Sequence, residues 1–190
     1  PLWNPEHDRP DDPVVGVSWH DAVSFASWAG KRLPTEAQWE KAARGGLIGK
    51  TYPFGDTIDR QRANYMSFGT MPVKSFAPNG YGLYDAAGNV WEWCRDWYSP
   101  GYYRISPDKN PPGPLVPFSP GRGSHGMYTM GLKERSAEVS PASEKVIRGG
   151  AWYCNRKALR VANRFKHNCG TGSFNIGFRC VRPAGRNGNM

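Results

Sequence analysis

The feature that most constrains this chain is its combination of many turn-forming residues with many large aromatic side chains after residue 46. The stretch NGYGLYDAAGNVWEWCRDWY, residues 79–98, is typical. The whole chain of 190 residues contains 23 Gly and 17 Pro together with 8 Trp, 9 Tyr and 8 Phe. Glycine and proline mark turns, whereas aromatic side chains supply large buried areas. We therefore expect many ordered loops held together by aromatic packing, rather than a helical bundle or a parallel α/β sheet.

Two short helices are predicted near the N-terminus, because two capping boxes occur there. Ser18 precedes a helical apolar pattern and Asp21 follows three residues later, while Gly30 is suited to end this helix. The same arrangement recurs with Thr35 and Gln38, and that pattern ends at a glycine pair. The two helices should each pack one apolar face on a core.

The remainder of the chain indicates short strands and loops. Residues 145–154, 159–165 and 175–181 are rich in Val, Ile, Trp and Phe and favour antiparallel strands. Residues 99–144 are rich in Pro, Ser and Gly and are predicted to form a long loop insertion. We expect a single domain over residues 1–190 of the α+β class, with two short helices, small antiparallel sheets and mostly ordered loop.

The charge of the chain is unevenly distributed. The net charge is +9, and residues 145–190 contain many cations and no acidic residue. Because these cations are interleaved with Gly, Trp, Cys and Phe, we expect Arg side chains to bond carbonyls and carboxylates within the fold, and we expect no nucleic-acid partner. No apolar run approaches the roughly 20 residues of a membrane span.

The cysteines show no metal-binding spacing. No CxxC occurs, and the four His are scattered, so a zinc site is not expected. Two disulfides and four free thiols remain alternatives. The compartment stays open, and we favour export to the periplasm or the outside of the cell. The four cysteines are Cys94, Cys154, Cys169 and Cys180.

Two carboxylates, Asp85 and Glu92, lie in an apolar segment, and three interpretations are open. Both could bind Ca²⁺ together with the carbonyl groups of Gly88 and Val90, because this ion accepts mixed oxygen ligands. Asp85 could instead cap a turn while Glu92 pairs with an Arg such as Arg148. General acid and base chemistry would require a cleft, and the sequence predicts none.

Cys154 follows a glycine pair and precedes Arg156 and Lys157. Neighbouring cations favour a thiolate, so a reactive thiol or a soft-metal ligand is conceivable. Packing is the alternative, and a two-sulfur site would need a second thiol, of which Cys169 is nearest in the chain.

Four stretches resemble, in order, the formylglycine-generating enzyme or sulfatase-modifying-factor family: residues 13–46, 78–93, 146–154 and 175–180. The resemblance implies a variant of the C-type lectin fold with bound calcium. It implies Asp85, Gly88, Val90 and Glu92 as calcium ligands. A second calcium site of the family starts at the position of Asn64, but the following loop, YMSFGTM, lacks its acidic ligand.

Active members of this family oxidise a substrate cysteine with Cu(I) held by two cysteines, and Cys154 matches the first. Leu159 or a neighbour stands where the second is expected. One thiolate cannot make a linear two-sulfur site, so we expect no copper and a noncatalytic domain. The alternative is a copper-dependent oxidase acting on a peptidyl cysteine or a small thiol, with Cys154 as the catalytic residue.

A recognition or scaffolding role is the favoured function, with a protein or anionic ligand as partner. Hypervariable ligand-display proteins with this fold share the ending of the chain. The family domain normally begins with further strands, so we also expect that N-terminal strands are missing and that a separate segment completes the fold. The residues predicted to bind the ligand are Trp91, Trp152, Tyr153, Arg160, Arg164 and Phe165.

Overall fold

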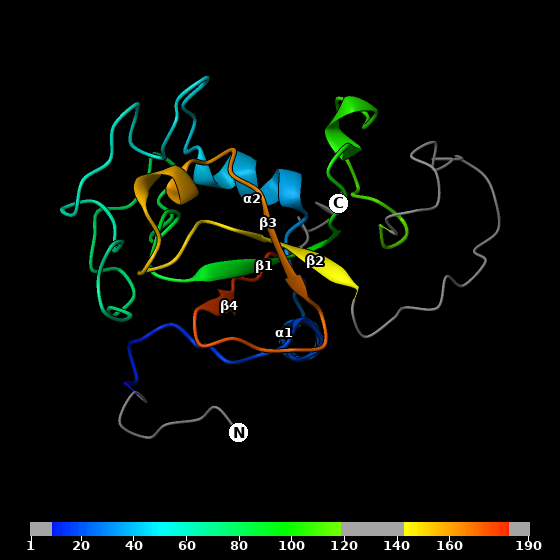
Figure 1. Cartoon of the computed structure of the whole chain (residues 1–190), viewed down its shortest axis with the longest axis horizontal. Coiled ribbons are helices and arrows are strands. Elements are labelled where there is room, and N and C mark those ends of the chain that lie inside the picture. Colours follow the sequence, from blue (N-terminus) through cyan, green and yellow to red (C-terminus); the bar gives the residue numbers. More distant parts are fainter. Residues whose placement is uncertain (1–8, 119–142, 183–190) are drawn as a thin grey trace, which may run out of the picture.

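A computed structural model describes residues 9–118 and 143–182, and Figure 1 shows their arrangement. The described elements are two α-helices, two 3₁₀ helices and four strands joined by long loops. In chain order they are α1 (Trp19–Trp28), α2 (Glu36–Ala43), β1 (Trp91–Trp97), η2 (Tyr102–Arg104), β2 (Glu144–Arg148), η3 (Arg156–Leu159), β3 (Phe165–Asn168) and β4 (Ile176–Phe178).

Both predicted helices are present, with the caps that the sequence indicates. The Ser18 side chain accepts a hydrogen bond from the backbone N–H of Asp21, and the Asp21 side chain accepts one from Ser18. Thr35 and Gln38 form the second capping box in the same way. Gly30 ends α1 with a φ of 64°, a conformation that glycine adopts without strain. Local side-chain chemistry is therefore sufficient to start and stop both helices.

The strands form one mixed sheet, so the prediction of small antiparallel sheets was only partly right. The order is β3-β2-β1-β4. β2 runs antiparallel to both β1 and β3, but β4 runs parallel to β1, with Glu92 opposite Gly177. Gly177 lies against the chain at this place, since an added Cβ would lie 2.4 Å from the carbonyl oxygen of Val14. The close approach of two backbones explains why a glycine stands in β4.

The two helices lie on opposite sides of the sheet, α2 above and α1 below in Figure 1. Alternate residues of β1 face them. Trp91 and Trp93 belong to a core that includes Ala22 of α1. Cys94 belongs to a second core that includes Trp39 of α2. The fold therefore has a layer of core on each face of the sheet.

Two other predictions meet the structure only in part. A strand predicted over residues 159–165 is wrong, because η3 and turns occupy most of this stretch and β3 starts at Phe165. Of the predicted insertion 99–144, residues 119–142 lie outside the described residues, and residues 102–104 form η2. Neither α-helix of the described part has the length and apolar character that crossing a membrane requires.

Candidate functional site: an aromatic surface, a carboxylate loop and a buried ion network

Four of the predicted ligand-binding residues form two ring pairs, which a hydrogen bond between the side chains of Trp91 and Tyr153 connects. Trp91 stacks on Phe165 with ring centroids 5.5 Å apart, and Trp152 packs edge-on against Tyr153 at 5.4 Å. A fifth ring, Phe174, lies 6.2 Å from Trp152 and was missed by the sequence reasoning. Its signal was an apolar residue in a polar turn, Ser173 to Asn175. We call these five residues the aromatic surface.

The aromatic surface combines buried and exposed rings. Trp91 is only 4% exposed, whereas Tyr153, Phe165 and Phe174 are 50%, 54% and 58% exposed. Stacking on a buried partner holds an exposed ring in one orientation, which lowers the entropy lost when a ligand binds. Burial raises the pKa of the Tyr153 hydroxyl, which therefore stays protonated at neutral pH. The arrangement can supply contact area, while the Tyr153 hydroxyl is engaged with Trp91, Cys154 and Asn175.

The two predicted arginines do not join these rings. Arg164 lies on the α2 side of the sheet, where its guanidinium group bonds Glu36 through Nε at 2.6 Å and through Nη2 at 2.8 Å. Arg160 is exposed after η3 and its Nε donates to the carbonyl oxygen of Lys157. Arg164 therefore serves an internal ion pair, and Arg160 belongs to the exposed cations of the η3 region.

Cys154 is buried rather than presented to solvent. It is 9% exposed and belongs to the same core as Leu159, which is fully buried. Its backbone N–H donates to Ala151, and its carbonyl oxygen accepts from Met66. All four cysteines, which lie in the described part of the chain, are free thiols, so of the two alternatives left open by the sequence the structure has the free thiols.

Cys169, the nearest thiol in sequence to Cys154, has different surroundings. Its backbone N–H donates to Ser143 and its carbonyl oxygen accepts from Trp19, at the start of α1. Cys154 instead exchanges backbone hydrogen bonds with residues 66 and 151. The two thiols are thus anchored by different parts of the chain.

Asp85, in the loop before β1, and Glu92, in β1, line one cavity. Asp85 and Glu92, together with Gly88 and Val90, border a space of about 770 Å³. The sequence did not predict this cavity. Arg179 contributes to its wall and holds both oxygens of Glu92, through Nε and Nη2 at 2.5 Å each. Because a guanidinium group occupies both oxygens, Glu92 is not free to act as a general acid or base.

Glu92 is ion-paired, but its partner is not the suggested Arg148. That partner is Arg179, and the indole N–H of Trp39 also donates to Glu92 at 2.6 Å. Asp85 caps a turn as predicted, since it accepts a hydrogen bond from the backbone N–H of Lys74 at 2.8 Å. Of the structural interpretation, the turn contact of Asp85 and the ion pair of Glu92 are present, but the arginine in that pair is Arg179.

The Asp85 carboxyl group is still incompletely compensated. Burial raises its pKa, the Lys74 hydrogen bond and the charge of Arg179 lower it, and the negative charge of Glu92 raises it. A carboxyl group destabilised as an anion by burial and by a second carboxylate is suited to receive a cation. The residues that line the cavity also offer backbone carbonyl groups, which are hard oxygen ligands. Asp85 and these carbonyl groups are therefore oxygen donors of the kind that calcium accepts, while both oxygens of Glu92 are already held by Arg179.

The backbone of the loop that contains Asp85 has an unusual conformation. Asp85, Gly88 and Asn89 have φ values of 53°, 79° and 65°, so the backbone turns sharply three times within five residues. At Gly88 an added Cβ would lie 2.3 Å from the carbonyl oxygen of Asn64. Only glycine fits this contact, which explains the residue at the position where a calcium ligand was expected.

Asn64, the start of the second family calcium site, is engaged in side-chain hydrogen bonds. Its Nδ2 donates to the carbonyl oxygen of Gly69 and to Oδ1 of Asn89. Its Oδ1 accepts from the Ser67 hydroxyl at 2.5 Å. Since the side-chain oxygen of Asn64 already accepts a hydrogen bond from Ser67, the role of Asn64 in this structure is to stabilise the loop.

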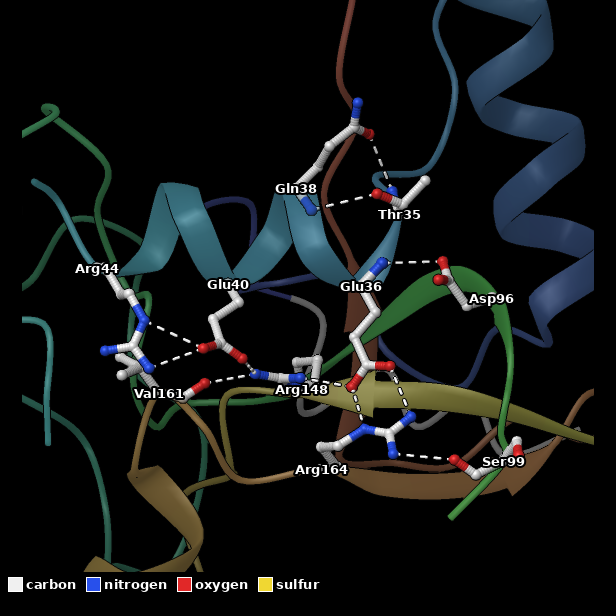
Figure 2. Close-up of polar contacts among 10 residues, drawn as sticks. All are labelled: Thr35, Glu36, Gln38, Glu40, Arg44, Asp96, Ser99, Arg148, Val161 and Arg164. Carbon is white, nitrogen blue, oxygen red and sulfur yellow. Dashed lines mark hydrogen bonds and ion pairs between the residues drawn. The ribbon is translucent and has the colours of Figure 1, made fainter. Parts of the chain in front are cut away.

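A buried ion network under α2 is the main feature that sequence reasoning missed (Figure 2). Arg148 is completely buried and donates to Glu36 at 2.5 Å, to Glu40 at 2.6 Å and to the carbonyl oxygen of Val161. Glu36 is completely buried as well and also bonds Arg164. Arg148 and Arg164 of the basic C-terminal quarter thus bond carbonyls and carboxylates inside the fold. This confirms the prediction for these two arginines.

The sequence comparisons agree with this fold. A family profile described as "Sulfatase-modifying factor enzyme 1-like domain" matches residues 3–184. The formylglycine-generating enzyme of Streptomyces coelicolor is 44% identical over 197 residues, which cover 93% of this chain and 54% of that protein. The "Inactive C-alpha-formylglycine-generating enzyme 2" of Bos taurus is 34% identical, over 92% of this chain and 51% of that protein. The chain spans about half the length of these two relatives.

A solved structure extends the comparison to three dimensions. Treponema denticola variable protein 1 superposes with a TM-score of 0.69 and 26% sequence identity, over 91% of this chain and 72% of that protein. The architecture of two helices and a small mixed sheet is therefore shared with a solved protein.

Proposed function

The chain belongs to the sulfatase-modifying factor enzyme 1-like domain family, and from this premise we propose that it is a noncatalytic recognition domain. In this proposal the aromatic surface binds a protein or an anionic ligand, and calcium stabilises the loop of Asp85. Family membership does not decide activity, since the relatives include a formylglycine-generating enzyme and a protein named as inactive. The choice between a catalytic and a noncatalytic domain must therefore rest on the geometry of the candidate site.

The observation that carries the proposal is the group of half-exposed rings held in place by the buried Trp91 and the partly buried Trp152. Tyr153, Phe165 and Phe174 are at least half exposed. Phe165 stacks on Trp91, and Tyr153 and Phe174 both pack against Trp152. Clustered exposed aromatic rings with fixed orientations are typical of interaction sites, where they supply most of the binding energy.

Two exposed cations close to Tyr153 in the chain favour an acidic ligand. Arg156 and Lys157 follow Tyr153 after two intervening residues and are both exposed, and no acidic residue occurs between residues 145 and 182. Lys166 does not belong to this group, because its side chain pairs with Glu144 and lies over Tyr98. Cations at the rim of a hydrophobic patch accelerate and orient association with an anionic partner.

The surroundings of Cys154 argue against oxidase chemistry. A reactive thiol requires access, but Cys154 is 9% exposed and packs in an apolar core beside the fully buried Leu159. Cu(I) favours two soft sulfur ligands, and Cys169 is anchored elsewhere, to Ser143 and Trp19. Oxidation of a thiol by oxygen is therefore not the function proposed for this chain.

The loop of Asp85 would hold calcium through the carboxylates of Asp85 and Glu92 and the carbonyl groups of Gly88 and Val90. When bound, the ion would supply charge compensation and rigidity, not reaction chemistry. Arg179 holds both oxygens of Glu92 in this structure, so this carboxylate would have to share its oxygens between the guanidinium group and the ion.

Selection from a random peptide display library tests recognition. Peptides selected on the wild-type protein should bind at least tenfold more weakly to Tyr153→Ser and Phe174→Ser. They should bind equally well to Trp28→Ser, which removes an 82% exposed ring from α1 and serves as the matched control. Equal binding to all variants would refute recognition by the aromatic surface.

Copper titration tests the choice between recognition and oxidation. The wild-type protein should not bind one equivalent of Cu(I), and a cysteine-containing peptide should cause no oxygen uptake. Stoichiometric Cu(I) binding that is lost in Cys154→Ser, together with oxygen uptake, would overturn the noncatalytic proposal in favour of the oxidase.

A further inference from the structure

A second groove lies on the outer side of α2, on the opposite face of the sheet from the core that contains Trp91. It has a volume of about 670 Å³, within the range of roughly 300–1,000 Å³ found for ligand sites. Ala37, Glu40, Lys41 and Arg44 line it, at the spacing that places residues on one face of a helix. We call this space the α2 groove.

The middle of the α2 groove is cationic. Glu40 is its only acidic lining residue in the described part of the chain, and both of its oxygens are occupied, by Arg44 and by Arg148. Arg44 also donates through Nη1 to the carbonyl oxygen of Lys50, but each of its Nη nitrogens carries a second N–H. Lys41 is exposed and adds a full positive charge. The wall thus offers unused donors to a carboxylate.

The two ends of the groove are apolar. Tyr103 of η2, 42% exposed, lies near the start of α2, where its ring faces Arg164 at 4.9 Å. Past the end of α2 the lining consists of Leu47, Ile48 and Tyr81, which are 38%, 94% and 54% exposed. Apolar side chains as exposed as Ile48 are candidates for contact with a partner.

We propose that the α2 groove binds a short extended peptide segment of a partner protein, in which acidic residues lie between two apolar residues. The eight residues of α2 span about 12 Å, and an extended peptide advances about 3.3 Å per residue, so the two apolar side chains of the peptide should lie between three and four residue steps apart. The apolar side chains contact Tyr103 at one end and Ile48 at the other, and the carboxylates face Lys41 and Arg44.

This site does not depend on the aromatic surface, and the two can be tested separately. Phe174 takes no part in the α2 groove, and Lys41 and Ile48 take no part in the aromatic surface. A failure of one binding activity therefore leaves the other intact.

The test uses fluorescein-labelled peptides capped at both ends, with LEEL as the central sequence. Fluorescence anisotropy should show that LEEL binds at least tenfold more tightly than SEES, which lacks apolar side chains, and than LKKL, which reverses the charge. Raising the salt concentration should weaken LEEL binding, because the carboxylate contacts are exposed and screened.

Two surface variants assign the binding to the groove. Lys41→Glu and Ile48→Asp change exposed side chains, and thermal melting checks that both fold. Each should weaken LEEL binding at least tenfold, whereas Phe174→Ser and Lys157→Glu should leave it unchanged. The proposal is overturned if LEEL binds no better than SEES or LKKL, or if both groove variants bind like the wild type. It is also overturned if inorganic phosphate alone competes fully with LEEL.

Discussion

The buried carboxylate of Glu36 should be among the most sensitive side chains of this fold. Its oxygens accept from Arg148 at 2.5 Å and from Arg164 at 2.6 and 2.8 Å, and its side chain has no solvent exposure. Replacement by glutamine keeps the size but removes the charge. One of the new N–H groups would then face an arginine N–H, donor against donor. Arg148 would then keep only Glu40, which also pairs with Arg44, and Arg164 would lose the carboxylate with which it pairs.

The expected loss follows from breaking a buried ion pair while one partner stays in place. Such changes cost about 3–5 kcal/mol, because the remaining charge is buried without compensation. For a domain of this size, 1 kcal/mol corresponds to about 2–4 °C in Tm, so Glu36→Gln should lower Tm by about 6–20 °C. The matched control is Glu144→Gln. It breaks the exposed pair with Lys166, in which the side chains are 40% and 42% exposed, and should cost only about 0–1 kcal/mol.

Urea unfolding followed by tryptophan fluorescence measures both variants, since Trp39 packs over Arg148 with the guanidinium carbon 5.3 Å from the ring centroid. The analysis requires equal m-values, so that a shift of the midpoint reports stability. If Glu36→Gln lost less than about 1 kcal/mol, no more than the exposed control, the idea that this network is fully desolvated would be refuted.

The other predictions concern calcium, pH and a glycine. Calcium should raise Tm after treatment with a chelator, and Asp85→Asn should abolish the response; an unchanged melt would contradict the site. Burial raises the pKa of Asp96 from 3.8 to about 6, so the folded protein holds a proton there that the unfolded chain releases. This group therefore lowers stability as the pH rises from about 4 to about 6. Asp96→Asn should lack this decline in unfolding experiments across that range, and parallel curves for both proteins would contradict it. Gly88→Ala should destabilise the fold by about 1–3 kcal/mol or more, since it combines a positive φ with a backbone clash. Gly69→Ala, where an added Cβ meets nothing within 4 Å, should be close to neutral in the same melt.

The helices could be predicted from the sequence because their determinants are local. Ser18 with Asp21, and Thr35 with Gln38, lie three residues apart, so the capping chemistry is visible in the chain itself. The parallel pairing of β4 with β1 could not be predicted. Residues 176–178 carry a strand-like pattern, but the pattern does not encode which strand lies beside them.

The ion network was invisible for the same physical reason. Glu36 stands in the first turn of a short helix, where an acidic residue usually faces solvent and stabilises the helix dipole. Its burial depends on Arg148 and Arg164, which are 112 and 128 residues away. The aromatic surface was easier to foresee, since Trp91, Trp152 and Tyr153 stand in dense aromatic segments. Phe174 was missed because it is a single ring in a polar turn.

The buried charges have a further consequence for the sheet. Successive residues of β1 serve opposite faces, with Trp91 in the core that lies beneath the aromatic surface and Glu92 directed to Trp39 of α2. A slip of one residue would exchange these faces and place an indole ring where the guanidinium group of Arg179 requires a carboxylate. Buried ion pairs often add little net stability compared with apolar residues of similar volume, but they penalise wrong arrangements strongly. The pair of Glu92 and Arg179, which bonds β1 to the residue after β4, is therefore best explained as the contact that sets the register between these strands.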